Sequence, residues 1–299
     1  MTHVLLYLLA LLCLSQSAAM ARWAAAPPEI IGFWRLLIAG FLVLPWALRK
    51  RRLSQELEQH PHEKKWIVAT GFFFFLHLGT FFYASQKTLI AHTMILFATN
   101  PLFVALGNWH FRNERPTSRL ALSYVLAFLA LILLLQQSQK SVDGFPMALH
   151  GDLAALASSI FFSIYILLSQ RCRKVYSNSV FTSGLYLVAA AFFAGLVLIR
   201  GLPWLDYPTH TWQGIGAQIL FPTLLGHSLI AYLMRHLNVT LMTTGKLSEP
   251  VMAAVVASFV FQEPLTSNGL LAFLLTGAAL VLLLAPFKAS KASSGEPRK

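Results

Sequence analysis

An apolar stretch with two Glu-Pro pairs occupies residues 246–266 and reads KLSEPVMAAVVASFVFQEPLT. An earlier stretch matches it at a constant distance: Pro101 lies 149 residues before Pro250, and Glu114 lies 149 residues before Glu263. The same shift pairs further positions without a gap, among them Tyr83 with Tyr232, Thr117 with Thr266, and Arg22 with Arg171. Matches at one offset within apolar segments indicate a duplicated membrane unit, and such internal repeats are typical of secondary transporters.

The composition is that of a chain folded within a membrane. Of its 299 residues, 57% are hydrophobic and only 11% are charged, and the mean hydropathy is +0.63. A soluble domain carries roughly a quarter charged residues, so a soluble protein is excluded. The formal charge of +12 does not indicate a nucleic-acid partner, because such a partner needs a basic patch within a recognisable module, and the sequence contains none.

Ten apolar segments follow one another along the chain. Each is close to the roughly 17 to 25 residues that a helix needs to cross the hydrocarbon core of a bilayer. They occupy about residues 4–26, 29–48, 65–86, 90–111, 119–136, 150–170, 177–199, 213–236, 240–262 and 267–286. The sequence therefore predicts an all-α polytopic membrane protein with ten transmembrane helices.

The distribution of Lys and Arg predicts the orientation of these helices, because both residues concentrate in cytoplasmic loops. With the N-terminus inside, 17 of them fall on the cytoplasmic side and 4 on the other side. The four are Arg22, Lys87, Lys140 and Arg200. Both termini are therefore expected in the cytoplasm, with residues 288–299 as a basic cytoplasmic tail.

The two copies of the repeat are expected at residues 1–140 and 149–287. Each copy contains five helices, so the second copy enters the membrane in the opposite direction to the first. Inverted copies are related by a pseudo-two-fold axis in the membrane plane, and a site between them can open to either side by symmetry-related motions. We expect the first apolar segment to be retained and not cleaved as a signal peptide, because no Lys or Arg precedes it and its loss would leave the first copy with four helices.

Several motifs stand at fixed places in these segments. They are Glu249-Pro250, Gln262-Glu263 and Gly277 in the second copy, Asn100-Pro101 and Asn113-Glu114 in the first, and the triplets Trp34-Arg35-Leu36 and Gly151-Asp152-Leu153. Over about residues 4–286 the chain resembles the EamA-type transporters of the drug/metabolite transporter superfamily, with Asn113 and Gln262 standing where the family often has Gly. The resemblance implies a ten-helix carrier of the cell inner (plasma) membrane, often an exporter of amino acids or other small metabolites.

Three charged side chains fall well away from the ends of predicted helices or beside the midplane glutamate, where a charge is costly unless it faces a cavity or a partner. Glu249 lies about 14 Å into its helix at 1.5 Å per residue, close to the midplane, and Lys246 lies on the same helical face. The two either form an internal ion pair or present opposite charges to a substrate. Arg35 either extends its guanidinium to the headgroups or binds an anionic group in the cavity.

The two repeat-related prolines, Pro101 and Pro250, are predicted hinges. A proline within a helix frees the carbonyl four residues before it, here those of Phe97 and Lys246. Freed carbonyls within a bilayer are tolerated only where protein or a water-filled cavity satisfies them, so both helices are expected to border the central cavity. Asn100, the equivalent of Glu249, is then a neutral polar contact at the same depth.

Histidine and tyrosine side chains complete the predicted site. His77 and His227 lie deep in their helices, where each is either a packed, hydrogen-bonded histidine or part of a proton relay. Tyr83, Tyr165 and Tyr232 are expected at the cavity, because their hydroxyls need partners in apolar surroundings. Since only Arg35 and Lys246 place a cation within the helices and not on either side of the membrane, amphipathic organic substrates are favoured over phosphates. No metal site and no cofactor are expected.

The sequence thus favours a carrier that moves a small organic metabolite outward by alternating access, with an amino acid or related compound as the first choice. Nucleosides and drugs are the alternative cargoes. The rival of another class is a lipid flippase or scramblase in which Arg35 holds a headgroup. An enzyme is not expected, because no nucleophilic grouping, metal cluster or nucleotide loop is recognisable. The expected partners are the substrate, membrane lipid and, if Glu249 titrates, protons; the chain is either a monomer or a homodimer.

Overall fold

The computed structural model describes residues 2–49, 52–112, 118–139, 145–226, 229, 233, 248–264 and 266–284. Its elements are all helices. They are α1 (Thr2–Ser15), α2 (Ser17–Ala24), α3 (Pro28–Leu48), α4 (Arg52–Gln59), η2 (Pro61–Glu63), α5 (Lys64–Lys87), α6 (Ile90–Phe97), α7 (Asn100–Arg112), α8 (Ser118–Gln139), α9 (Ala148–Val175), α10 (Asn178–Ile199), α11 (Thr209–Gln218), the π-helix η3 (Ile219–Gly226), α14 (Glu249–Val260) and α15 (Ser267–Leu284).

Six helical segments of the described chain are long and apolar enough to cross a membrane. They are Leu5–Ala24, Pro28–Leu48, Pro61–Lys87, Ile90–His110, Ala148–Val175 and Asn178–Ile199. Shorter apolar helices occupy Ala121–Leu133, Glu249–Val260 and Ser267–Ala279. The predicted all-α membrane architecture is confirmed, whereas the count of ten is not established, because the expected segments 213–236 and 240–262 are described only in part.

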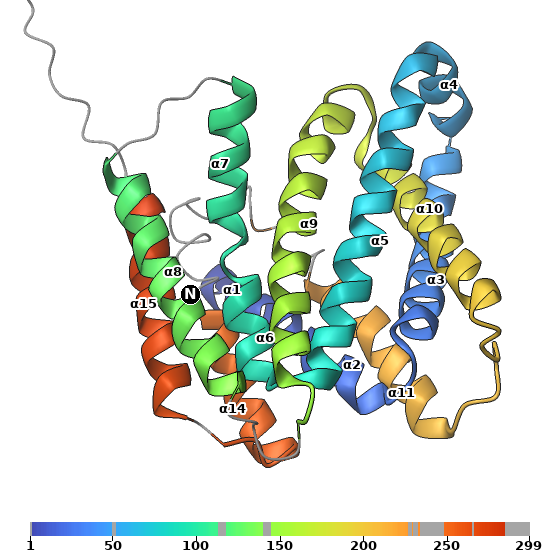
Figure 1. The fold of residues 1–299 in the computed structure, drawn as a ribbon. Helices are drawn as coiled ribbons and strands as arrows, with labels where there is room; N and C mark the ends of the chain where they lie inside the picture. The colour runs from blue at the N-terminus through green and yellow to red at the C-terminus, as the bar shows by residue number, and fades with distance from the viewer. Residues whose placement is uncertain are drawn as a thin grey trace, which may run out of the picture.

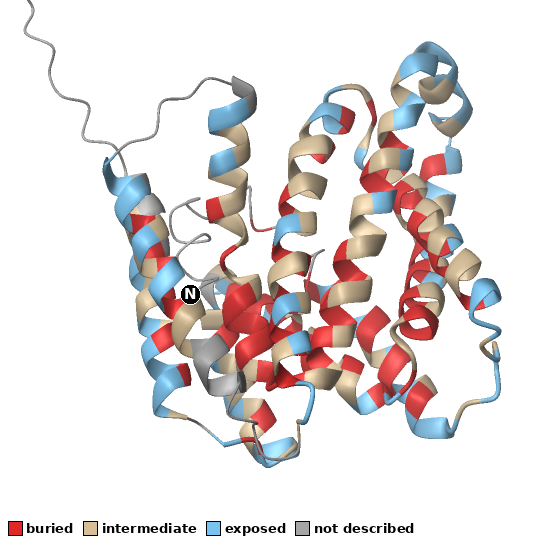
Figure 2. Ribbon diagram, in the orientation of Figure 1, coloured by how far each residue is buried: buried red, intermediate tan, exposed pale blue. Residues whose placement is uncertain are grey.

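The long helices form a bundle with two distinct ends (Figure 1). One end carries α4 and the end of α9; the other carries α2, the turn between α5 and α6, and the start of α9. We call them the α4 end and the α2 end. Buried residues gather mostly in the half of the bundle nearer the α2 end (Figure 2). Bulky apolar side chains such as Trp46, Ile199 and Phe259 are exposed on the outside, as a lipid-facing surface requires.

Helices α3 and α10 hold matching places in the two copies and pack closely against each other in opposite directions. Arg200, at the end of α10, donates a hydrogen bond of 2.6 Å to Glu29, at the start of α3. Between them the ring of Phe193 lies where a Cβ on Gly32 would be, so glycine is what allows the two helices to approach. Matching helices that run antiparallel are the arrangement expected of inverted copies.

Three of the helical segments are irregular. The first is broken at Gln16, between α1 and α2, and the fourth is broken at Ala98 and Thr99, between α6 and α7. The third irregularity is the π-helix η3, which contains Pro222. Breaks and π-helical turns in otherwise regular helices often coincide with functional sites, and these three guide the description of the site.

The start of α9 packs directly on the turn between α5 and α6. Gly151 allows this contact, and the neighbouring Asp152 accepts a 2.6 Å hydrogen bond from the hydroxyl of Thr88 in the turn. Both Asp152 and Thr88 are fully buried. The Gly-Asp pair at the start of α9 therefore joins the second copy to the first.

Gly151→Ala should destabilise the protein, because the added Cβ would lie 2.7 Å from the Cβ of Thr88 and 2.8 Å from its backbone nitrogen. Overpacking of this kind costs about 1 to 3 kcal/mol. The matched control is Gly195→Ala in α10, whose added Cβ meets no atom within 4 Å. Thermal unfolding in detergent should show a lower midpoint for the first variant only. Equal midpoints would contradict the packing described.

Candidate functional site

The break between α6 and α7 exposes backbone groups that α9 satisfies. The carbonyl of Phe97 accepts hydrogen bonds from the side-chain amide of Asn100, at 2.9 Å, and from the hydroxyl of Ser159, at 3.2 Å. The hydroxyl of Ser163 donates to the carbonyl of Asn100 at 2.9 Å. Protein groups of α9 thus satisfy the carbonyl that the sequence analysis associated with Pro101.

Both repeat-related prolines stand in the first turn of a helix. Asn100 and Pro101 begin α7, and Glu249 and Pro250 begin α14. The sequence analysis placed the prolines inside continuous helices. The structure differs because a proline in the first turn removes no intrahelical hydrogen bond and its fixed φ suits a helix start. Two helices therefore begin inside the bundle, each with a polar side chain at its first residue.

Glu249 faces the first helix of the chain. The side chain is partly buried, α14 packs against α1, and the buried Tyr7 of α1 lies within electrostatic range of the Glu249 carboxylate. Lys246, the predicted partner of Glu249, lies outside the described residues, as do His227 and Tyr232.

His77 and Tyr165 lie in a cluster of aromatic rings between α5, α6, α9 and α10. His77 is buried, its Nδ1 lies 2.8 Å from the hydroxyl of Ser158, and its ring stacks on Phe97 with centroids 5.1 Å apart. The ring of Phe74 lies 4.9 Å from that of Tyr165. This cluster surrounds the α6–α7 break, so the structure brings His77, Tyr165 and Asn100 into one region.

Tyr83 stands apart from that region, near the α2 end of α5. It is partly buried, and the ammonium of Lys87 lies 6.0 Å from the centre of its ring.

Arg35 is held in the bundle by neutral groups. Its side chain is 5% exposed; Nε donates to the Thr223 hydroxyl at 3.1 Å, and Nη1 donates to Gln218 Oε1 at 2.7 Å and to the Ser17 hydroxyl at 3.3 Å. The ring of Phe82 lies 5.6 Å from its Cζ. The sequence analysis left two interpretations of Arg35 open, extension of its guanidinium to the headgroups or binding of an anionic group. The buried position of the side chain does not fit the first of them.

Sequence reasoning missed the three partners of Arg35. Ser17 follows the break in the first helix, Gln218 ends α11, and Thr223 lies in η3. The sequence did contain a sign of this site, because the polar Gln218 and the helix-disrupting Pro222 stand within the predicted apolar helix 213–236. A proline at such a position points to local irregularity of the helix.

A second buried polar network closes the α2 end of the bundle. Arg22 of α2 forms an ion pair with Glu263, which follows α14, and also donates to the carbonyls of Ser85 and Thr88. Glu263 accepts a 2.8 Å hydrogen bond from the backbone N–H of Ile90. Asp152, bound by Thr88, also lies 3.1 Å from the Nδ1 of the buried His92.

We call Arg22, Thr88, His92, Asp152 and Glu263 the latch. It ties α2, the α5–α6 turn and α6 of the first copy to α9 and the end of α14 in the second copy.

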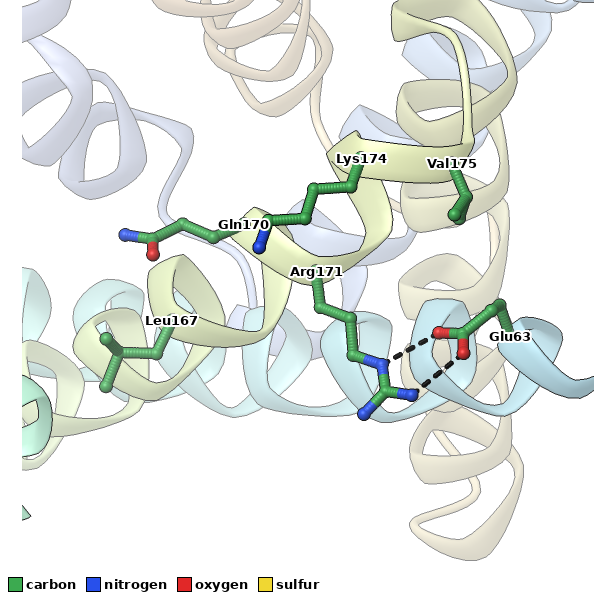
Figure 3. Close-up of a pocket in the computed structure, with 6 residues that line it drawn as sticks. All are labelled: Glu63, Leu167, Gln170, Arg171, Lys174 and Val175. Atoms are coloured by element: carbon green, nitrogen blue, oxygen red, sulfur yellow. Dashed lines mark hydrogen bonds and ion pairs between the residues drawn. The ribbon is translucent and has the colours of Figure 1, made fainter. Parts of the chain in front are cut away.

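The opposite end carries a hollow of about 430 Å³ between η2 and α9 (Figure 3). It is lined by Glu63, Leu167, Gln170, Arg171, Lys174 and Val175. Arg171 binds Glu63 with two hydrogen bonds of 2.8 Å. The hollow lies at the α4 end, far along α9 from the α6–α7 break, and its Arg171 and Glu63 are already paired. We therefore do not assign the substrate site to it.

A family model described as "EamA-like transporter family" matches residues 1–136 and 149–285. The chain belongs to the EamA-like transporter family. Family membership confirms the resemblance read from the sequence, and it makes the chain a multi-pass membrane transporter of small molecules with a two-repeat architecture. The family consists of transporters and not of enzymes.

A solved structure titled "Crystal structure of protein" matches the chain with a TM-score of 0.64 and 22% sequence identity. The match covers 95% of this chain and 98% of that chain, and at this identity it shows the fold alone. A search of curated proteins found no match. Among the described residues of this EamA-like chain, no group of three or more metal-ligating side chains comes together.

Removing one partner of the latch ion pair should destabilise this EamA-like chain. The side chains of Arg22 and Glu263 are only 13% and 6% exposed, so Glu263→Gln leaves a largely buried guanidinium without its counter-charge, at a cost of about 3 kcal/mol. A double-mutant cycle with Arg22→Gln, followed by denaturant unfolding in detergent, should show strong coupling.

The matched control is the same cycle at Arg171 and Glu63, a pair at the exposed α4 end that should couple several times more weakly. Equal coupling in the two cycles would contradict the latch.

Proposed function

We propose that this chain is a secondary transporter that exports a small organic metabolite, an amino acid or related compound, by alternating access between its two copies. The observation that carries the proposal is that both copies begin a helix inside the bundle at the same register, on Asn100-Pro101 in α7 and on Glu249-Pro250 in α14. Helix ends within a bundle, at the interface of inverted copies, are where carriers of this general design bind their substrates. The family match supports the small-molecule cargo.

The proposed substrate contacts are the side chains that the sequence analysis singled out. They are Glu249, Lys246, Asn100, Arg35, His77, His227, Tyr83, Tyr165 and Tyr232, with Pro101 and Pro250 as hinges. The aromatic cluster around His77 and the small number of intramembrane cations favour an amphipathic substrate over a phosphate. The buried rings pack on one another and provide an apolar surface. Selection between cargoes then depends on the hydrogen-bonding groups beside them.

We place the α4 end in the cytoplasm and the α2 end outside, with both termini cytoplasmic and the chain in the cell inner membrane. The excess of Lys and Arg at the α4 end supports this orientation. With the copies divided at residues 1–140 and 149–287, the latch then holds the outer side closed. Alternating access requires that the latch opens when the substrate leaves.

Glu249→Gln should abolish transport or change the substrate preference, because the variant removes the only carboxylate at the two internal helix starts. Uptake into proteoliposomes is the measurement, with matched protein content verified for each preparation. Glu58→Gln is the matched control, since Glu58 is exposed on α4. Transport at the wild-type rate by the Glu249 variant would remove Glu249 from the proposed site.

A proton gradient should accelerate transport if Glu249 exchanges a proton with solvent during the cycle. Vesicles with and without an imposed pH gradient provide the comparison, at fixed substrate concentration and fixed internal volume. Loss of the acceleration in Glu249→Gln assigns the coupling to this carboxylate. A wild-type rate that ignores the gradient would make the protein a facilitator.

A further inference from the structure

Arg35 carries a charge for which the described residues provide no counter-charge. The residue lies seven positions into α3, about 10 Å from its start at 1.5 Å per residue, and its side chain is 95% buried. None of the ion pairs formed within the described residues includes it. A buried charge without a counter-charge is one of the most costly groups a protein can hold.

The undescribed part of the sequence contains no acidic residue within a predicted apolar segment. Positions 227–247, which contain most of the undescribed intramembrane sequence, include no Asp or Glu. The acidic residues elsewhere outside the description are Glu114, Asp143 and Glu296, all of which lie outside the predicted apolar segments. A bound ligand is the remaining source of a counter-charge for Arg35.

The neutral partners of Arg35 hold its guanidinium in a fixed orientation. Gln218 Oε1 accepts from both Arg35 and Ser17, and the amide nitrogen of Gln218 donates back to the Ser17 carbonyl. The Thr223 hydroxyl accepts from Arg35 and donates to the Gln218 carbonyl at 2.9 Å. Nε and Nη1 make all the hydrogen bonds of Arg35 to the described residues, which leaves Nη2 for a ligand.

The repeat does not preserve this group of four residues. The repeat counterparts of Ser17, Arg35, Gln218 and Thr223 are Ile166, Gly184, Ala69 and Phe74, and none has a polar side chain. The symmetry-related place, which is likewise shared between the two copies, has none of these hydrogen bonds, and there α5 and α9 run without a π-helix or a break. The hydrogen bonds from Thr223 to the Gln218 carbonyl and from Gln218 to the Ser17 carbonyl support the local break and the π-helix, but neither requires a charged group, so Arg35 is the member of the set that a ligand would explain.

The surroundings restrict the ligand to a small negative charge on an apolar body. Phe82 is fully buried and lies over the guanidinium, and Tyr186 lies within electrostatic range of it. Among the described residues, Arg22, a second arginine that is largely buried, is neutralised by Glu263. One free guanidinium suits a carboxylate, whereas a phosphate dianion needs further cations.

We propose that Arg35, positioned by Ser17, Gln218 and Thr223, is an anion subsite that binds the carboxylate of the transported substrate. The inference rests on the proposed function, since it names the chemical class of that cargo. Arg35 makes the contact through its guanidinium. Ser17, Gln218 and Thr223 are positioning residues that act through it.

Calorimetric titration of the full-length protein in nanodiscs tests the subsite without any transport step. The probes are L-phenylalanine, its carboxamide, 3-phenylpropanoate and phenyl phosphate, which share one ring and differ in charge. Both carboxylates should bind at least tenfold more tightly than the carboxamide and more tightly than the phosphate, because charge-assisted hydrogen bonds are lost in the amide. A carboxamide that binds as well as the acids, or a failure of both acids to bind, would overturn the proposal.

Three variants assign the effect to this group of residues. Arg35→Gln should lose the preference for acid over amide, whereas Thr223→Val should weaken acid binding several-fold and keep the preference. Arg171→Gln, at the exposed α4 end, should bind as the wild type does. Wild-type acid affinity in Arg35→Gln would overturn the proposal, and the acid–amide comparison in the unmodified protein decides it even if that variant does not fold.

The same probes in proteoliposomes separate this inference from the proposed function. Transport of the carboxamide at a rate equal to that of the acids would overturn the carboxylate subsite and leave the carrier function intact. Tight acid binding to the unmodified protein, abolished in Arg35→Gln and without transport of any probe, would support the subsite and count against transport of this class of cargo.

Discussion

A polar group within the hydrocarbon of a bilayer has to find its partner inside the protein, and the architecture of this chain depends on that requirement. The helix between residues 90 and 112 can be broken because serines of α9 satisfy the exposed carbonyls of Phe97 and Asn100. The π-helical η3 is tolerated in a comparable way, since the Thr223 hydroxyl donates to the carbonyl of Gln218. At both places a side-chain hydroxyl satisfies a backbone carbonyl at the irregularity.

The same requirement separates the charged groups into two kinds. Arg22 has a carboxylate partner in Glu263, and removing either leaves the other charge buried and unpaired. Arg35 has only neutral partners among the described residues. Its N–H groups find hydrogen-bond acceptors there, but its positive charge finds no counter-charge. The first kind fastens one end of the bundle, and the second provides an attraction for an anionic ligand.

Inverted duplication explains why these features are distributed as they are. Arg22 and Arg171 hold matching places in the two copies. Arg22 forms an ion pair with Glu263 at the α2 end of the bundle, and Arg171 forms one with Glu63 at the α4 end. Where both copies keep a feature, as in the helix starts at Asn100 and Glu249, we propose that it serves the transport mechanism common to the two copies. Where only one copy keeps it, as at Arg35 and its counterpart Gly184, the substrate is the reason we propose for the difference.

The sequence by itself determined the membrane class, the duplication, the family and the two internal positions of Asn100 and Glu249, because hydropathy and repeat offsets are properties of the chain alone. It also singled out Arg35, since a charge within an apolar segment is visible without a fold. Only the tertiary structure decided that Pro101 and Pro250 begin helices, that Ser17, Gln218 and Thr223 surround Arg35, and that Arg22 meets Glu263. These contacts join residues up to 241 positions apart, and no local pattern encodes which distant side chain will satisfy a buried group.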